Sequence, residues 1–254
     1  VDIAKNFDAH IAKEEIDLRL NESVEQVIMR DNDVRVVLAS QSSIHACAII
    51  IASGTRYRGR EILPLDCGVT VDDAIIEGPH AFLHIDTLVQ KIIIIIGAGD
   101  NAFENALLLL EQGCYVTMLA RSLPTAQSRF LETVLDHPNF TLLTQAVIHD
   151  ITKKDGVLIA TVENDQVYQI KADRLHVLAG YQANTDRLPA VISSGIEQQL
   201  QYDEKGFLVV DACGQTNVKN IYAVGDVCNT QFPCVVSAIA SGALAAKIIS
   251  PNVL

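Results

Sequence analysis

The sequence predicts an α/β fold in which helices cover a parallel sheet, and three observations support this prediction. Five consecutive isoleucines, Ile92–Ile96, have the continuous β-branched character of a central strand that is buried on both faces. A turn that contains Gly97 and Gly99 follows this strand directly. The residues 101–112 then favour a helix, which Gly113 ends. Strand, turn and helix in this order are typical of a parallel-sheet unit.

The turn at residues 97–102 has the spacing G-x-G-x-x-A, which favours binding of a dinucleotide pyrophosphate. Gly97 allows a tight turn, Gly99 lets the backbone approach a phosphate, and Ala102 lets the helix pack against the strand. The free N–H groups and partial positive charge of the helix N-terminus attract the anion. The alternative is an ordinary strand-to-helix turn. The predicted cofactor-binding residues of this turn are Gly97, Gly99, Asp100, Asn101 and Ala102.

The end of the next predicted strand, 115–120, bears on which dinucleotide is bound. An NAD site carries an acidic residue there, about 20 residues after the glycine turn. Here the strand ends in Arg121 and Ser122 instead. A guanidinium binds phosphate in a fork, so this pair favours the 2′-phosphate of NADPH over NADH. Arg129, on the next predicted helix, is placed to assist. The alternative is that Arg121 is a solvated strand end.

Two further apolar strands end in residues that suit a second cofactor. A strand at 48–52 leads into Ser53–Gly54, and a strand within 216–224 leads into Gly225–Asp226. Glycine lets the backbone approach a ligand closely, and an aspartate accepts hydrogen bonds from ligand hydroxyls. Either one alone is compatible with a core strand and a turn, but their order around the first glycine turn disfavours that interpretation.

These motifs together resemble the thioredoxin reductase-like group of FAD- and NAD(P)H-dependent pyridine nucleotide oxidoreductases, over nearly the whole chain. Ser53 stands where the group has threonine in its Ala-Thr-Gly strand, and Ala183 where it has proline in Gly-x-x-Pro-Asn-Thr. The matching segments are residues 51–54, 97–106, 180–185, 220–226 and 233–246.

The resemblance implies two Rossmann-like, three-layer nucleotide-binding domains, one inserted into the other. An NAD(P)H-binding domain at 85–179 interrupts an incomplete FAD-binding domain at 1–84 and 180–254. The crossings near 80–88 and 180–185 would then form a hinge. The resemblance also implies the residues that hold FAD, which are Ser53, Gly54, Gly225, Asp226 and Val235.

The chain departs from the group at its N-terminal FAD fingerprint, a G-x-G-x-x-G on the first strand, which is absent. Residues 2–13 resemble the helix that precedes the β-ribbon of the first domain. We therefore expect that about one strand–helix–strand unit, at least ~30 residues, is missing and that the chain is a fragment. Binding of FAD by this chain alone is left open.

The second departure concerns the redox pair. The group places Cys-x-x-Cys shortly before the NADPH strand, whereas Cys67 stands alone in that stretch. Dithiol exchange needs an attacking thiolate and a resolving partner, so disulfide reductase activity is doubtful and no catalytic residue is assigned. Pairing of Cys228 with Cys234 is disfavoured relative to free, buried thiols. The six cysteines are Cys47, Cys67, Cys114, Cys213, Cys228 and Cys234.

Metal and acid–base sites are not predicted. His80 and His84 have a spacing that places both on one helix face, but no carboxylate ligand accompanies them. None of the six cysteines has zinc-site spacing. His149 and Asp150 form a candidate acid–base pair, for which a hydrogen bond at a strand end is the commoner interpretation.

Composition limits the partners. A chain of 254 residues with 49% apolar and 20% charged residues forms a globular core. The formal net charge of −12 argues against nucleic acids and anionic membranes, and the longest apolar run, 92–96, is too short to span a bilayer. Cysteines without framework spacing favour the cytoplasm. The basic cluster 56–60 is interpreted as a solvated loop, and a homodimer is left open.

Shorter patterns predict the remaining elements. Alternation indicates a β-ribbon with a turn at 31–33. The predicted ribbon strands are 16–20, 24–30 and 34–39; a helix near 124–137 and strands at 140–145, 157–162, 167–170 and 175–179 follow.

The leading functional hypothesis is an FAD-dependent oxidoreductase that passes a hydride from NADPH to FAD and on to an unidentified acceptor, without a redox dithiol. One alternative is a ferredoxin- or flavodoxin-NADP reductase-like enzyme, and another is a non-catalytic NADPH-binding sensor module. A thioredoxin reductase that uses a distant cysteine pair is a third.

Overall fold

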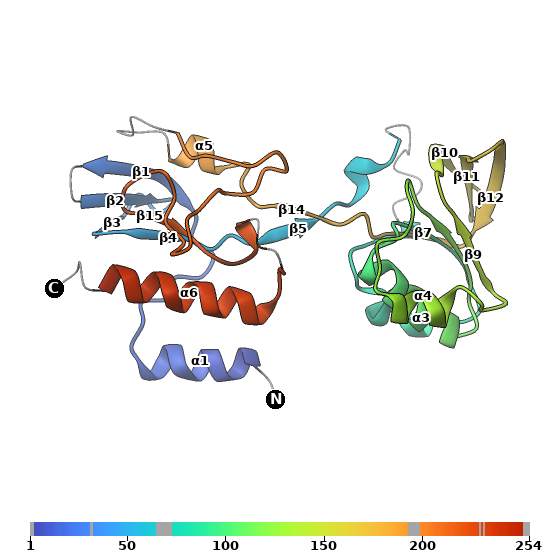
Figure 1. Cartoon of the computed structure of the whole chain (residues 1–254), viewed down its shortest axis with the longest axis horizontal. Coiled ribbons are helices and arrows are strands. Elements are labelled where there is room, and N and C mark those ends of the chain that lie inside the picture. Colours follow the sequence, from blue (N-terminus) through green and yellow to red (C-terminus); the bar gives the residue numbers. More distant parts are fainter. Residues whose placement is uncertain are drawn as a thin grey trace. The chain divides into compact units, whose positions relative to one another are not determined.

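The computed structural model describes residues 3–30, 33–64, 73–192, 199–228, 230 and 232–250. The chain divides into two compact units (Figure 1). The first unit combines residues 1–54 and 183–254, and the second unit is residues 55–182. The first unit is therefore discontinuous in sequence, and the second is inserted into it.

A five-stranded parallel sheet forms the centre of the second unit, and its strand order is β6-β13-β7-β8-β9. The isoleucine run is β7, the central strand, as its continuous apolar character predicts. The strands are β6 (Ile75–Glu77), β13 (Arg174–Val177), β7 (Ile92–Ile96), β8 (Tyr115–Leu119) and β9 (Phe140–Leu143).

Different layers cover the two faces of this sheet. Ile93 and Ile95 belong to a core shared with the helices α3 (Asp100–Glu111) and α4 (Ser128–Val134). Ile94 belongs to a second core, shared with an antiparallel sheet. That sheet consists of β10 (Val147–Lys154), β11 (Val157–Glu163) and β12 (Val167–Ala172). The second unit thus has the three layers expected of it.

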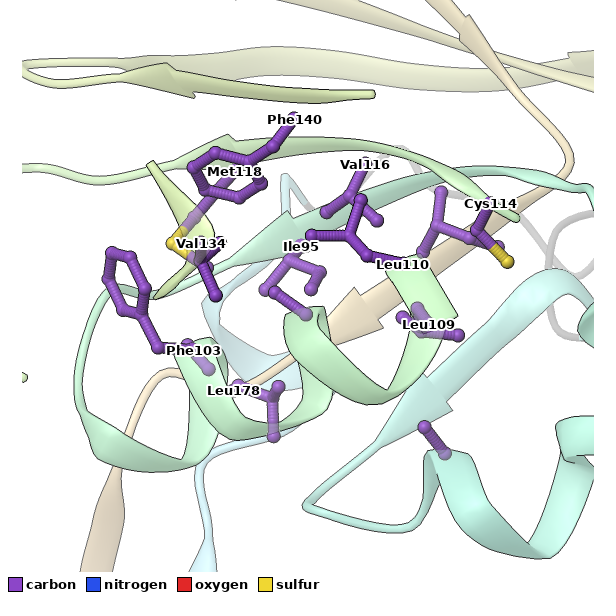
Figure 2. Close-up of a cluster of buried hydrophobic side chains, with 14 of the residues drawn as sticks. Ile95, Phe103, Leu109, Leu110, Cys114, Val116, Met118, Val134, Phe140 and Leu178 are labelled. Carbon is purple, nitrogen blue, oxygen red and sulfur yellow. The ribbon is translucent and has the colours of Figure 1, made fainter. Parts of the chain in front are cut away.

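The helix side of this core is filled by large side chains from α3 and β8 (Figure 2). The helix α3 buries residues at the i, i+3 and i+4 spacing of one helix face. Gly113, at a φ of +73°, follows the helix end, as its position in the sequence predicts. The buried residues of α3 are Ala102, Phe103, Asn105, Ala106, Leu109 and Leu110.

The first unit contains two small sheets and its own core. An antiparallel sheet of order β1-β2-β3 accompanies a parallel pair, β4 and β15. Ile51 and Ile221 from the parallel pair share a core with Val27 and Val34. The strands are β1 (Val24–Arg30), β2 (Asp33–Leu38), β3 (Ser43–Ala46), β4 (Ile49–Ile51) and β15 (Ile221–Ala223).

Helices and short connections complete the two units. The long helices of the first unit are α1 (Ile3–Lys13) and α6 (Val235–Ile249), as predicted near 2–13 and 233–246. No helix in the described ranges is both long enough and apolar enough to cross a bilayer. The short elements are β5 (Thr55–Tyr57), η1 (Arg60–Ile62), η3 (Ala81–His84), α2 (Ile85–Leu88), β14 (Tyr181–Ala183), α5 (Leu188–Val191) and η4 (Gly225–Val227).

Several sequence expectations differ from the structure. Residues 16–20 are not a strand, and β3 is the third strand of the ribbon instead. The apolar residues there alternate with polar ones as in a strand, but they do not form a buried face. Each of Ile16, Leu18 and Leu20 is more than half exposed. The strand β10 was not predicted, because its residues are mostly polar. Two residues of the expected turn at 31–33 lie outside the described ranges.

The boundary between the units also lies elsewhere than the sequence suggests. Residues 55–84 and 180–182, which were predicted to lie in the first domain, belong to the second unit. The reason is that β6 pairs in parallel with β13 at the edge of the central sheet. A three-residue strand of this kind carries too little pattern to be recognised from sequence.

A fully buried histidine on β13 is another feature that the sequence did not reveal. The Nε2 atom of His176 lies 2.6 Å from the carbonyl oxygen of Gly78. Because a carbonyl only accepts, Nε2 carries the hydrogen, and the buried Nδ1 has no partner in the described part of the chain. Burial, reinforced by the nearby His80 and His84, lowers the pKa of His176 to about 4.

We expect His176 to make the second unit less stable in mild acid. The unfolded imidazole takes up a proton near its usual pKa of about 6.5, whereas the folded one does so only near 4. Between these values the unfolded chain binds more protons, so stability falls as the pH falls. From about pH 7.5 to about pH 5.5 the loss is roughly 1.3 kcal/mol in urea unfolding. His176→Gln retains a donor for Gly78 and should lack this component. An identical pH dependence in both proteins would contradict the assignment.

We also expect Gly97→Ala to destabilise the second unit more than a matched glycine change. Gly97 has a φ of +119°, and an added Cβ would overlap the carbonyl oxygen of Leu178. Gly156 also has a positive φ, +81°, with nothing within 4 Å of its would-be Cβ, so Gly156→Ala measures the cost of a positive φ without an overlap. The extra loss at Gly97 should be about 1–3 kcal/mol, measured by urea unfolding. Equal losses at the two positions would show that the Leu178 contact is unimportant.

Candidate nucleotide-binding sites

A cavity of about 520 Å³ lies at the carboxyl ends of the central strands of the second unit. Its lining includes the residues that follow β7, β8 and β13, and all of its lining residues fall within 55–182. The strand after β7 in sequence, β8, lies on one side of β7, and β13 lies on the other. Ligands of open α/β sheets bind at such a switch point, and the volume is that of a typical ligand pocket.

The predicted glycine turn forms one wall of this cavity, since Gly97, Gly99 and Ala102 all line it. Gly99 is the N-cap residue of α3 and provides no side-chain cap for the first N–H groups of the helix. A Cβ at Gly99 would come no closer than 3.8 Å to its nearest neighbour, the Thr125 hydroxyl, so there is room beside this backbone. Ala102 is fully buried against the sheet. These observations fit a phosphate-binding turn.

Asp100 and Asn101 also line the cavity, but their side chains bond within the protein. The Asp100 carboxylate accepts hydrogen bonds from the backbone N–H of Gln127 at 2.8 Å and from its side-chain amide at 3.0 Å. The Asn101 amide donates to the Tyr181 hydroxyl at 2.8 Å. These two side chains therefore brace the start of α3 against the loop after β8 and against β14.

The structure brings the predicted 2′-phosphate residues to the same cavity. Arg121 and Ser122 follow β8, line the cavity and are exposed. The Ser122 hydroxyl donates to the Leu123 carbonyl at a long 3.4 Å, so it is weakly engaged. Arg129 lies on α4, is exposed and is not among the lining residues.

In the first unit, Ser53 and Gly54 form a closed turn with the returning chain. The Ser53 hydroxyl donates to the Asn184 carbonyl at 2.9 Å, and the Asn184 amide donates to the Ser53 carbonyl at 2.9 Å. The backbone N–H of Asn184 also donates to the Gly54 carbonyl at 2.9 Å. Gly54 has a φ of +64°. The Ser53 hydroxyl thus holds the turn in place.

Gly225 and Asp226 follow β15 in the same unit. The backbone N–H of Gly225 donates to the hydroxyl of Ser241 on α6 at 3.0 Å. The Oδ1 atom of Asp226 is buried and has no hydrogen-bond partner in the described ranges. A buried carboxylate oxygen without a donor fits the hydroxyl of a bound ligand. Val235, at the start of α6, is 60% exposed, so its side chain is free to meet a ligand.

The cysteines and histidines form no further site in the described residues. Five cysteines are free, with Cys47 and Cys234 exposed, and Cys67 lies outside the described ranges. Burial raises the pKa of the Cys228 thiol to about 11, which disfavours a reactive thiolate. The described residues contain no group of three side chains that could together bind a metal ion. The imidazole of His149 contacts Glu163 on β11 at 2.5 Å, across the strands.

Three residues of the cavity wall were not predicted from the sequence. They are Tyr57, Arg58 and Tyr181, and the ring centroids of Tyr57 and Tyr181 lie 5.2 Å apart. Tyr57 and Arg58 come from the basic stretch that was interpreted as a solvated loop. No local signal marks them, because their position depends on β5 pairing with β14.

Comparison with known proteins supports the same fold and family. The chain is 22% identical over 250 residues to a 34.2 kDa protein in the rubredoxin operon of Clostridium pasteurianum, covering 96% of this chain and 77% of that protein. It is 27% identical over 248 residues to the thioredoxin reductase of Treponema pallidum, covering 94% and 72%. It spans only 36% to 47% of several longer relatives.

The structure is similar to that of T. acidophilum thioredoxin reductase, with a TM-score of 0.78 and 19% identity, covering 100% of this chain and 81% of that one. This likeness confirms the predicted α/β class with two Rossmann-like domains. The family model of the pyridine nucleotide-disulphide oxidoreductases matches residues 79–242, more than half of the chain. FAD and NADPH are the cofactors of this family. The chain therefore belongs to the pyridine nucleotide-disulphide oxidoreductase family.

Proposed function

We propose that the chain is an NAD(P)H-dependent flavin oxidoreductase that passes a hydride from NADPH to FAD and on to an acceptor that is not a Cys-x-x-Cys pair. We assign NADPH binding to the inserted unit, 55–182, and FAD binding to the other unit. A cytoplasmic location, which the cysteine pattern favours, is part of this proposal.

One observation carries the assignment of NADPH. The fold places two motifs, separated by the whole length of α3, on the wall of a single cavity. The turn at Gly97 and Gly99 offers uncapped N–H groups to bridging phosphates, and Arg121 with Ser122 offers donors to a 2′-phosphate. An ordinary strand-to-helix turn would not require both motifs to meet at one cavity.

The assignment of FAD depends on the turn after β15. The buried Oδ1 of Asp226 would accept a hydrogen bond from a ribityl hydroxyl, and Gly225 would leave room for the ligand beside α6. Gly54, held through Ser53 and Asn184, would form the second contact. When bound, FAD supplies the two-electron chemistry between nucleotide and acceptor.

The sensor alternative also has an observation in its favour. Every residue that lines the cavity belongs to the second unit, so nucleotide binding needs nothing from the unit that would hold FAD. No comparable observation favours a ferredoxin or flavodoxin reductase. Two arginines of the basic stretch already have partners, because Arg60 pairs with Glu77 and Arg56 contacts Gln182.

We expect the purified chain to retain a visible flavin absorbance after incubation with FAD and removal of the unbound FAD. NADPH, added in the absence of oxygen, should bleach this absorbance. Asp226→Asn removes the carboxylate charge at nearly the same volume and should lower the flavin content. A colourless chain that still binds NADPH would support the sensor module. A chain that binds neither nucleotide nor flavin, with a normal unfolding transition, would contradict the whole proposal.

We expect Arg121→Ala to weaken NADPH far more than NADH. Loss of a charge-assisted bond to the 2′-phosphate should lower the NADPH affinity about ten- to a hundred-fold and leave the NADH affinity nearly unchanged. Isothermal titration with both nucleotides measures the two changes. Lys154→Ala is the control, since it removes an exposed positive charge on β10 that does not line the cavity, and it should affect neither. Equal losses for both nucleotides in Arg121→Ala would remove the reason to prefer NADPH.

A further inference from the structure

We propose that Arg58 is a second arginine of the nucleotide site and binds the bridging phosphates of the dinucleotide from the side of the cavity opposite Arg121. This inference deepens the proposed function and rests on it. Arg58 lies outside both the glycine turn and the end of β8.

The backbone sets Arg58 apart from its neighbours. The N–H of Arg58 donates to the carbonyl of Gly180 at 2.9 Å, which fixes Arg58 beside the chain that leaves β13. Arg56 contacts the side chain of Gln182 instead, and the Nε of Arg60 lies 2.6 Å from Glu77. Of these three arginines, only Arg58 lines the cavity.

The guanidinium of Arg58 has an unused donor. Its Nε atom is buried and has no hydrogen-bond partner in the described part of the chain. A buried donor without an acceptor costs free energy, and a charged one costs more. An anion in the cavity would satisfy this donor. The planar fork of guanidinium matches phosphate oxygens, which makes a phosphate the best-fitting anion.

The charges around the cavity point the same way. The chain carries a net charge of −12, yet its charged lining residues are Arg58, Arg121 and Asp100. The Asp100 carboxylate is already bound by Gln127. The N-terminus of α3 adds partial positive charge. This cavity is therefore a positive site in an acidic protein, as an anionic ligand requires.

The order of the strands places the two arginines on either side of the glycine turn. Arg121 follows β8, which borders β7 on one side. Arg58 is bonded to Gly180, just after β13, which borders β7 on the other side. A dinucleotide whose 2′-phosphate meets Arg121 would have its bridging phosphates at the turn after β7, within the space between the two arginines. Arg58 would then contact the group that NADH and NADPH share.

Isothermal titration of the whole chain and of its variants measures the dissociation constants of NADP⁺ and NAD⁺ and so tests this inference. Arg58→Ala should weaken both nucleotides by a similar factor, about ten- to a hundred-fold, whereas Arg121→Ala should weaken NADP⁺ selectively. Arg56→Ala is the matched control from the same stretch and should change neither. Adenosine 2′-monophosphate lacks the bridging phosphates, so its affinity should be the same in the wild type and in Arg58→Ala.

The outcomes separate this inference from the proposed function. A wild-type chain that binds neither nucleotide would overturn both. A wild type that binds both, with Arg58→Ala unchanged, would overturn the role of Arg58 alone. A loss confined to NADP⁺ would mean that Arg58 contacts the 2′-phosphate, which also contradicts the inference. If Arg58→Ala does not fold, Arg58→Lys keeps the charge without the fork and should give a smaller loss, equal for both nucleotides.

Discussion

The close packing of β7 between two layers is the constraint on which the nucleotide-binding unit depends. Ile93 and Ile95 fill the helix side and Ile94 fills the side of the antiparallel sheet, so this strand has no polar face. A strand buried in this way cannot slip in register without placing its side chains in the wrong layer. The turn that follows it is therefore fixed in position. The backbone N–H of Leu178 donates to the carbonyl of Ile96 at 2.8 Å, which holds the start of that turn beside the chain that leaves β13.

The site follows from this fixed turn. Parallel strands bring the carboxyl ends of β7, β8 and β13 to the same edge of the sheet, so residues distant in sequence meet at one cavity. Some side chains of the cavity wall are hydrogen-bonded within the protein. Asp100 bonds to Gln127, and Asn101 bonds to Tyr181. The groups left over for a ligand are the backbone at the start of α3 and the arginines.

The features that could be predicted from the sequence are those marked by a short, continuous stretch of residues. The run Ile92–Ile96 and its glycine turn were recognisable because burial on both faces and a tight turn each leave a short, continuous pattern. Arg121 was recognisable because it ends the next strand. Arg58 was not, since its role depends on a hydrogen bond to Gly180, far along the chain. His176 was missed for the same reason, because its partner Gly78 lies on a distant segment.

The most direct test of this account is a crystal structure of the chain with NADP⁺ bound. We expect the bridging phosphates to lie at the N-terminus of α3, beside Gly99, with the 2′-phosphate near Arg121. A nucleotide bound away from this cavity, or bound in it with its phosphates distant from α3, would contradict the central claim that the turn after β7 is a dinucleotide site.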